Sequence, residues 1–455
     1  MKNYFFCGVG GSGMSSLALI LKSEGNEICG SDRAFDRRQS PDKFKTLERQ
    51  GIVMFPQDGS GINEKTDCLV VSSAVEETIP DVIKARSLNI PVRKRAELLA
   101  ELLHRHNGIA VAGTSGKTTT TGMTGHILKE CGLDPTVVNG GVMLNYPESA
   151  GLGSVLIGQG SFCVIEADES DGSIQLYNPE VALVNSITLD HKPIEELRPL
   201  FTSFVARASV GAVLNADCPE TLMLKNKNQN VMTYSVTGAD ADLKAEKLTP
   251  SETGISFVLD SDVIRLQVAG RHNVSNALAA LCAADMIGIP RKDAIQALES
   301  FKGIRRRMET VGTTSKQITV IDDFAHNPEK IAASLEALKE HDGRLIIIYQ
   351  PHGFGPTRMM RHGIVEAFNK GMSLDDILFM PEIYYAGGTA SKDISSADLI
   401  KDLERTGKRV HFSADRSKIT ALVKSAARKG DRIVVMGARD ETLSDFARTL
   451  LKAVS

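Results

Sequence analysis

The sequence predicts an α/β protein with three domains, each built around a sheet of mainly parallel strands. The chain has 455 residues, which exceeds the usual size of one domain. Short runs of apolar and β-branched residues alternate with helix-length amphipathic segments, as in parallel sheets covered by helices. This pattern restarts near residues 107 and 311, so we expect domains over 1–107, 108–311 and 312–455.

The composition is that of a folded protein with little net charge. Hydrophobic residues make up 42% and charged residues 24%, which excludes a mainly disordered chain. The net charge of -3 gives no general basic field, so we expect no nucleic-acid partner. No stretch approaches the roughly 20 apolar residues of a membrane-spanning helix, so we expect no membrane insertion. Seven cysteines without a C-x-x-C pair favour reduced thiols and a cytoplasmic location.

The first domain opens with a glycine loop between a strand and a helix. The motif Gly8-x-Gly10-x-x-Gly13 follows a strand expected over 4–7 and begins a helix expected over 14–23. Amide groups at such a helix start can hold a diphosphate. Asp32 ends the next strand, where a dinucleotide-binding fold contacts a ribose hydroxyl. The motif therefore indicates a nicotinamide dinucleotide, another diphosphate ligand, or only tight packing of strand against helix.

The second domain opens with a sharper motif. A strand expected over 109–112 runs into Gly113-Thr114-Ser115-Gly116-Lys117-Thr118, and a helix follows from about 118 to 130. Glycines, a lysine and hydroxyl residues in this order can surround nucleotide phosphates and hold Mg²⁺. Val111 stands where the common spacing of this loop requires glycine, so the loop is a shorter variant. We interpret it as an ATP site, the alternative being an ordinary solvated lysine.

An acidic run follows a later strand of the second domain. The strand expected over 162–165 leads into Glu166-Ala167-Asp168-Glu169-Ser170-Asp171. Beside a nucleotide this run predicts a magnesium site, because Mg²⁺ on phosphates usually takes one or two protein carboxylates. Without a nucleotide, the same run would indicate only a solvated acidic loop. His191, after the strand over 181–185, is a weaker candidate for the same metal.

Two further segments carry polar side chains near the end of the second domain. An alanine-rich helix begins at 271–276 with His272, Asn273 and Asn276, where asparagines can cap the helix or contact an adenine edge. The basic cluster 303–307 is either solvated surface or a phosphate clamp. The third domain then follows, with strands expected over 318–321, 344–349, 377–380 and 432–436.

Taken in order, these motifs resemble the Mur ligase family of cell-wall peptide-bond-forming enzymes. The resemblance runs nearly end to end and rests on an ordered set of segments. These are the first glycine loop with Met14, Cys29–Asp32, Val71–Ala74, Arg95–Ala100, Gly113–Thr118, Glu166–Asp171, Asp190-His191, His272–Asn276, Asp322–His326 and Gly437–Asp440.

The resemblance implies a fold, a reaction and cofactors. It implies a Rossmann-like N-terminal domain, a central P-loop ATPase domain and a Rossmann-like C-terminal domain. The enzyme would use ATP and Mg²⁺ to activate the carboxylate of a UDP-linked muramoyl substrate as an acyl phosphate, which an amino acid or peptide then attacks. Such an enzyme would serve peptidoglycan synthesis as a monomer or homodimer. Positioning and charge neutralisation dominate such phosphoryl transfer, in agreement with the motifs.

The resemblance also implies which residues of each domain form the site. Lys117, His191 and Arg306 would be catalytic, and Thr118, Glu166 and His191 would surround the metal. The nucleotide would contact Gly113, Thr114, Ser115, Gly116, Lys117, Thr118, Thr119, His272, Asn273, Asn276, Arg306, Asp323 and His326. The UDP-linked substrate would contact Gly10, Gly11, Ser12, Gly13, Met14, Asp32, Ser72, Ser73 and Ala74. The acceptor would contact His352, Arg358 and Arg439.

Departures from the family pattern concern mainly the acceptor. Ser115 stands where His is usual, Lys192-Pro193 where an Asp is usual, and Gly353 where an Arg is expected. The segment 350–358 resembles the alanine-adding branch, whereas 305–309 and 323–326 resemble the branch that recycles a ready-made peptide. We therefore expect an amino acid, L-alanine first, with a tripeptide as the alternative. A nicotinamide oxidoreductase and a P-loop ATPase without ligase activity are more distant hypotheses.

Overall fold

A computed structural model describes the whole chain except residues 74, 189–192, 252–253, 342 and 386–390. The chain forms two compact units. The first comprises 1–249, 255–267 and 271–304, and the second comprises 305–455 with the short segments 250–254 and 268–270.

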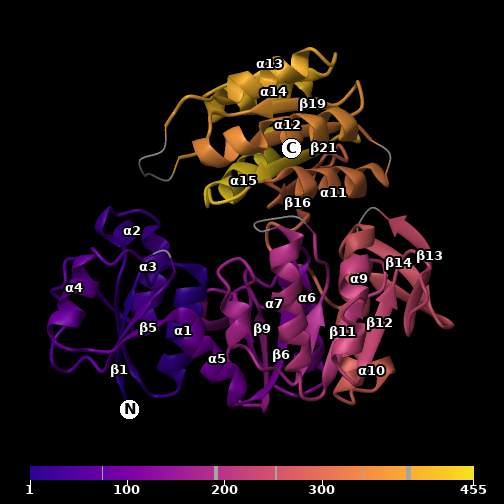
Figure 1. Ribbon diagram of the computed structural model, residues 1–455. Helices are drawn as coiled ribbons and strands as arrows, with labels where there is room; N and C mark the ends of the chain where they lie inside the picture. Colours follow the sequence, from indigo (N-terminus) through magenta and orange to yellow (C-terminus); the bar gives the residue numbers. More distant parts are fainter. Residues whose placement is uncertain (74, 189–192, 252–253, 342, 386–390) are drawn as a thin grey trace. The chain divides into compact units, whose positions relative to one another are not determined.

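The first unit begins with a five-stranded parallel sheet in the order β3-β2-β1-β4-β5. Its strands, in indigo to purple in Figure 1, are β1 (Asn3–Cys7), β2 (Glu27–Ser31), β3 (Val53–Phe55), β4 (Cys68–Val71) and β5 (Val92–Lys94). The helices between them are α1 (Ser12–Ser23), α2 (Arg33–Asp36), α3 (Pro41–Arg49), α4 (Pro80–Ser87) and α5 (Arg95–His104). Strand β1 is central because Phe5, Phe6 and Cys7 are buried on it.

A ten-stranded sheet forms the rest of the first unit, in the order β15-β14-β13-β12-β11-β10-β6-β9-β7-β8. Its strands are β6 (Asn107–Ala112), β7 (Thr136–Val138), β8 (Val155–Leu156), β9 (Phe162–Glu166), β10 (Val181–Val184), β11 (Gly211–Asn215), β12 (Val231–Ser235), β13 (Leu243–Ser251), β14 (Gly254–Leu259) and β15 (Asp262–Leu266). Its helices are α6 (Lys117–Glu130), α7 (Ile194–Ala206), α8 (Pro219–Leu222), α9 (Arg271–Met286) and α10 (Arg291–Glu299). The central strands β9, β6, β10 and β11 are parallel, and the hairpin β14–β15 is antiparallel.

The second unit contains a six-stranded sheet in the order β16-β17-β21-β18-β19-β20, parallel except for β16. Its strands are β16 (Glu309–Thr313), β17 (Thr319–Asp323), β18 (Leu345–Gln350), β19 (Ile377–Met380), β20 (Arg409–Phe412) and β21 (Arg432–Gly437). Its helices are α11 (Pro328–Lys339), α12 (Phe354–Gly371), α13 (Ser396–Glu404), α14 (Arg416–Ala426) and α15 (Leu443–Val454). Helices α11, α12 and α13 share one apolar core with the sheet, and α14 and α15 share the other.

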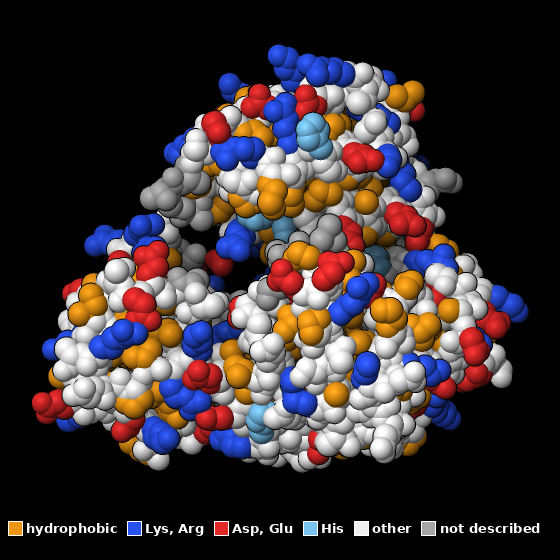
Figure 2. Space-filling view, in the orientation of Figure 1, with side chains coloured by type: hydrophobic (Ala, Val, Ile, Leu, Met, Phe, Trp, Pro, Cys, Tyr) orange, Lys and Arg blue, Asp and Glu red, His pale blue; other side chains and the backbone are white. Residues whose placement is uncertain are grey.

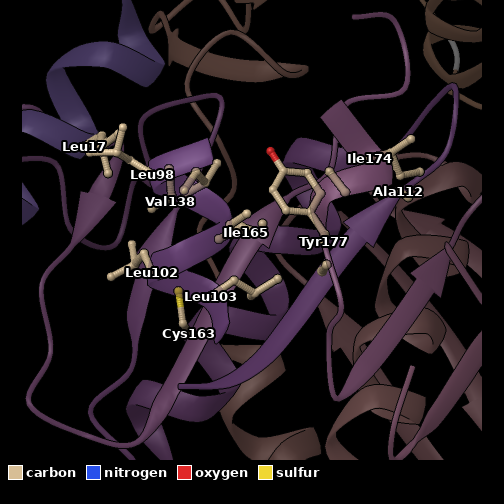
Figure 3. Packing of buried hydrophobic residues seen from close by; sticks show 14 of the residues in the cluster. Leu17, Leu98, Leu102, Leu103, Ala112, Val138, Cys163, Ile165, Ile174 and Tyr177 are labelled. Carbon is tan, nitrogen blue, oxygen red and sulfur yellow. The ribbon is translucent and has the colours of Figure 1, made fainter. Parts of the chain in front are cut away.

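The two sheets of the first unit share one hydrophobic core. Leu17 on α1 and Leu98 and Leu102 on α5 belong to the same buried cluster as Cys163 and Ile165 on β9. Figure 3 shows these side chains close together, with Val138 beside them. Burial of this apolar surface joins the N-terminal sheet to the central one.

The sequence-based interpretation of the elements is confirmed for the strands that carry the motifs. The strand expected over 377–380 is observed with those bounds, and most of the others differ by one or two residues at an end. The hairpin β14–β15 and the short strands β7 and β8 were not expected. No helix among the described residues has the length and apolar character needed to cross a membrane. On the face drawn in Figure 2, basic and acidic side chains are interspersed, as the small net charge predicts.

Candidate functional site

The predicted phosphate loop lies between β6 and α6, where the backbone requires glycine at two positions. Gly113 has φ 124° and Gly116, the residue before α6, has φ 83°. A Cβ on Gly113 would lie 2.9 Å from the amide nitrogen of Ser186. Thr114 fixes the loop from the other side, since its amide donates to the Ser186 carbonyl at 2.9 Å and its Oγ1 lies 2.8 Å from Oγ1 of Thr188. The loop is thus fastened to the segment that follows β10.

Lys117 is held at the mouth of this loop by two oxygen groups. Its Nζ donates to the Gly113 carbonyl at 2.6 Å and to Oε2 of Glu169 at 2.9 Å. The Glu169 side chain is 3% exposed, and burial raises its pKa while the Lys117 charge opposes that shift. The sequence places Glu169 in an acidic run, but it does not show that this carboxylate pairs with the lysine. The Gly113 carbonyl and the Glu169 carboxylate therefore fix the position of the ammonium at the start of α6.

Glu166 and Thr118 both lie against a pair of adjacent glycines. The Gly140 amide donates to Oε1 of Glu166 at 2.8 Å. A Cβ on Gly141 would lie 3.2 Å from the Thr118 methyl carbon, so the two predicted metal-binding residues flank one short segment. A carboxylate and a hydroxyl beside a phosphate loop are a suitable oxygen-donor set for Mg²⁺. The residues present fit that ion.

A chain of buried amides connects the loop to helix α9. Asn185 donates from Nδ2 to Oγ1 of Thr120 at 2.9 Å, and Thr120 donates to Oδ1 of Asn276 at 3.2 Å. Asn276 in turn donates to Oδ1 of Asn273 at 3.2 Å. Two of the predicted nucleotide contacts, Asn273 and Asn276, are thereby brought to the phosphate loop. His272 is exposed on the same first turn, and Thr119 is half-buried on α6.

In the N-terminal sheet, the first glycine loop is closed by the carboxylate of Asp32. Gly8 has φ 82°, and the Gly10 amide donates to Oδ2 of Asp32 at 2.8 Å. The other oxygen of Asp32 accepts from the Ala34 amide at 2.8 Å and caps α2. Both carboxylate oxygens therefore stabilise the loop and the following helix. Contact of Asp32 with a substrate stays a prediction.

The other described residues predicted for the UDP-linked substrate follow β1 and β4, which are neighbours in the sheet. Gly11 and Ser12 are exposed at the start of α1, whereas Met14 is buried in the core. Ser72 and Ser73 follow β4, the neighbour of β1. Ala74 in this group and His191 of the metal group lie outside the described residues.

Arg95 is a residue near this loop that the sequence interpretation left without a role. Its Nη1 would lie 3.1 Å from a Cβ on Gly13, so its guanidinium covers the first turn of α1. Its charge also helps to lower the pKa of Asp168 against the opposing effect of burial, together with the hydrogen bonds from Ser170 and the charge of Lys117. Arg95 therefore lies between the two glycine loops. A lone arginine at the start of a helix gives no sequence signal of that position.

Arg306 holds the turn that follows β21 in the second unit. Its guanidinium donates to the Gly437 carbonyl at 2.6 Å, to the Asp440 carbonyl at 3.3 Å and to Oδ1 of Asp322 at 3.3 Å. It also lies 5.2 Å from the centre of the Phe324 ring. These contacts give Arg306 a structural role, and the predicted contact with the nucleotide stays a prediction.

Asp323 and His326 occupy the end of β17. Oδ2 of Asp323 accepts from the Ser334 hydroxyl at 2.5 Å and Oδ1 accepts from the Met308 amide at 3.1 Å. Burial, together with the charges of Lys330, His352 and Arg307, lowers the pKa of His326 from 6.5 to about 4. The His326 and His352 rings lie 5.3 Å apart, so the loops that follow β17 and β18 meet here, although β21 lies between the two strands in the sheet.

The three predicted acceptor residues differ in their surroundings. His352 follows β18 and has a pKa lowered by burial and by the charge of Arg439. Arg358, on α12, donates to the Ser391 carbonyl at 3.1 Å and pairs with Asp393. Arg439 is exposed and follows β21 with φ 62°. Gly353, where an arginine was expected, precedes α12 with φ 69°, a conformation that favours glycine.

Three protein-family models match consecutive parts of the chain, one for each sheet. The model described as "Mur ligase family, catalytic domain" matches residues 3–107, and "Mur ligase middle domain" matches 111–284. The model described as "Mur ligase, glutamate ligase domain" matches residues 306–439. Proteins named UDP-N-acetylmuramate--L-alanine ligase are similar over the full length. One from Sulfurihydrogenibium sp. is 35% identical and covers 100% of this chain and 98% of its own. The chain belongs to the Mur ligase family.

Further members of the Mur ligase family agree with this assignment. A protein of the same name from Jannaschia sp. is 37% identical and covers 98% of this chain and 94% of its own. A UDP-N-acetylmuramate-alanine ligase from Thermotoga maritima has the same fold, with a TM-score of 0.83, 24% identity and 99% of both chains covered. A murein peptide ligase from Psychrobacter arcticus gives a TM-score of 0.70 at 25% identity and covers 100% of this chain and 99% of its own.

Proposed function

We propose that this Mur ligase joins an amino acid, L-alanine in the first place, to the carboxylate of UDP-N-acetylmuramate at the expense of ATP. A carboxylate oxygen attacks the γ-phosphorus of ATP, ADP leaves, and an acyl phosphate forms. The amine of the acceptor then attacks the acyl carbon, and inorganic phosphate leaves as the amide forms. The relatives at 35–37% identity carry the alanine-ligase name, which favours alanine over a tripeptide.

The observation that carries this proposal is the anchored lysine at the mouth of the phosphate loop. Lys117 is held by the Gly113 carbonyl and the buried Glu169 carboxylate, at the start of α6. In this position the ammonium neutralises the β- and γ-phosphates, which is what phosphoryl transfer requires of the protein. Glu169 fixes the lysine rather than reacting with the substrate.

Magnesium belongs to the same proposal. Thr118 and Glu166 would hold the ion, together with His191 from the family resemblance. A bound Mg²⁺ would neutralise phosphate charge during transfer. Glu166→Gln removes one formal charge with little change in shape, so it should raise the Mg²⁺ concentration that half-saturates the reaction.

The proposed roles divide along the chain. Residues 1–107 bind the UDP-linked substrate at the first glycine loop, 108–311 bind ATP, and 312–455 carry the acceptor. The seven cysteines are free thiols, and this supports the cytoplasmic location that we infer.

An assay with the whole chain tests the proposed function. The protein is incubated with ATP, Mg²⁺, UDP-N-acetylmuramate and single amino acids, and ADP release and the UDP-linked product are measured. We expect ADP release that depends on both substrates, and a product heavier by one amino-acid residue. Lys117→Ala should abolish both while the protein still folds. Reduction of NAD⁺ without amide formation would contradict the proposal.

A further inference from the structure

The strand order of the second unit predicts a crevice beside β21. Strand β18 lies beside β21, and their registers pair Gln350 with Gly437 at the carboxyl end. After β18 the chain enters α12, which packs on one face of the sheet; after β21 it enters α15, which packs on the other. Adjacent strands whose connections leave in opposite directions open a crevice at their carboxyl ends, and ligands of open α/β sheets bind there.

Two polar side chains follow the paired ends of β18 and β21. His352 comes from the loop after β18 and Arg439 from the turn after β21, and the charge of Arg439 acts on the His352 ring. His326 joins them from β17, its ring 5.3 Å from that of His352. The cluster thus combines one guanidinium with two imidazoles.

The turn that carries Arg439 is fixed by two other arginines. Arg306 donates to the carbonyls of Gly437 and Asp440. Arg416, at the start of α14, pairs with the Asp440 carboxylate and donates to Oε1 of Gln350 at 2.6 Å and to Oγ1 of Thr442 at 2.8 Å. Asp440 itself is 2% exposed, whereas its neighbour Arg439 is exposed.

Arg439 adopts a backbone conformation that is unfavourable for its residue type. Its φ of 62° lies in the left-handed region, which costs a residue with a Cβ about 1 kcal/mol. Strain of this kind persists where the surroundings impose it, and it is concentrated at functional sites. The clamp by Arg306 and Arg416 supplies the constraint. The backbone of an exposed arginine is thereby held in one conformation.

Other arginines close in sequence to these loops are already paired. Arg358 is bound to Asp393, and Arg361 donates to Oδ2 of Asp402 at 2.7 Å. Within the part of the chain that the structure describes, Arg439 has no carboxylate partner in any ion pair. Its charge is therefore available to a ligand.

We infer that Arg439 binds the carboxylate of the incoming amino acid in the crevice between β18 and β21, and that Arg416 is a positioning residue that acts through Asp440. This inference rests on the proposed function. An amino acid that reacts through its amine keeps an ionised carboxylate, and a guanidinium binds that group through two parallel hydrogen bonds. Arg439 thereby supplies the cation that is missing at Gly353.

The test compares an acceptor with and without its charge. Acceptor-dependent ADP release is measured with L-alanine and with L-alaninamide in the wild type, Arg439→Gly, Arg439→Lys and Arg416→Lys. Glycine suits the left-handed backbone, so Arg439→Gly removes the guanidinium without strain. Arg448→Ala, on the exposed side of α15 and paired only with Asp445, is the control.

We expect Arg439→Gly to raise the KM for L-alanine on the order of 10- to 100-fold, with the KM values for ATP and UDP-N-acetylmuramate unchanged. The preference for L-alanine over L-alaninamide should disappear in this variant. Arg439→Lys should keep part of the preference for L-alanine. Arg416→Lys should weaken this preference, while kcat at saturating acceptor changes little. Arg448→Ala should behave as the wild type.

One result would refute the role of Arg439, and a different result would refute the proposed function. An unchanged preference for L-alanine in Arg439→Gly, with the KM raised instead by Arg358→Ala, assigns the carboxylate to Arg358 and refutes the inference. Failure of the wild-type protein to ligate any amino acid or tripeptide refutes the proposed function itself.

Discussion

At the scale of single residues, the pairing of Lys117 with Glu169 decides how the phosphate loop works. An aliphatic lysine stem carries considerable conformational entropy, and an ion pair at the loop mouth removes that freedom before ATP arrives. The Glu169 carboxylate is buried, so loss of its charge leaves the ammonium without its main partner. The acidic run therefore contains residues with different roles: Glu169 orients the lysine and Glu166 lies beside the Gly140 amide.

Glu169→Gln tests this division of roles. We expect kcat/KM for ATP to fall on the order of 10- to 100-fold, because a charge-assisted hydrogen bond contributes about 1.5–3 kcal/mol. Asp171→Asn is the matched control, since Asp171 is exposed in the same loop and accepts only from the Ser173 amide. Steady-state kinetics at varied ATP distinguish them. Equal effects of the two substitutions would make Glu169 an ordinary member of an acidic surface loop.

His326 makes a second prediction at this scale, concerning stability and pH. Its pKa is about 4 in the folded chain against 6.5 ordinarily. Between these values the unfolded chain binds a proton that the folded chain does not, so stability falls as pH falls from 6.5 to 4. The loss for this group is at most about 3 kcal/mol. His326→Gln should flatten the dependence of melting temperature on pH in this range, and an unchanged slope would assign the dependence to other groups.

At the scale of elements, each of the two glycine loops is shaped by a contact with the segment that follows a neighbouring strand. The phosphate loop after β6 is fastened to the segment after β10 through Thr114 and Ser186. The first glycine loop is fastened to the end of β2 through Asp32. In both cases the glycines allow the backbone to approach these neighbours closely. Loop geometry is therefore a property of pairs of strands.

Gly116→Ala should disturb the phosphate loop through its neighbours. A Cβ at this position would lie 2.5 Å from Oδ1 of Asn276 and 2.6 Å from Nδ2 of Asn185, so both amides must move. We expect a large rise in the KM for ATP. Gly132→Ala is the control, because Gly132 has φ 79° but nothing within 4 Å of its Cβ position. It should cost about 1 kcal/mol of stability and leave ATP use unchanged. A shift of the same size in both variants would refute the proposed contact.

At the scale of the whole molecule, the two units differ in how independent their cores are. The largest core of the first unit contains side chains from both of its sheets, as Figure 3 shows for α1, α5 and β9. The two cores of the second unit contain only residues between 308 and 454. The second unit therefore buries its apolar surface without help from the first.

This difference predicts how fragments of the chain behave. A fragment of residues 305–455 should fold alone and unfold cooperatively, because both faces of its sheet are covered by its own helices. A fragment of residues 1–107 should expose the apolar side chains of α1 and α5 and bind a hydrophobic dye. Circular dichroism on heating and dye fluorescence measure these properties. Cooperative unfolding of 1–107 without dye binding would contradict the shared core.

The fold class, the motif-bearing strands and the glycine loop before α6 could be predicted from the sequence, because these depend on local patterns. Apolar runs mark parallel strands, and glycines next to Lys117 mark a loop that accepts phosphate. The family followed from the order of the motifs. Unexpected elements such as the hairpin β14–β15 lacked a comparably clear pattern.

Only the tertiary structure decided which side chains meet. Glu169 is separated from Lys117 by 52 positions and Arg416 from Asp440 by 24, and no local pattern encodes either pair. Asp32 was expected at a ligand, and only the folded chain shows that its two oxygens also accept from the backbone amides of Gly10 and Ala34. Strand order brings the loops of β18 and β21 together, although the paired residues Gln350 and Gly437 lie far apart in the sequence. Contacts of that kind arise from the packing of helices on opposite faces of a sheet, which is a property of the folded chain.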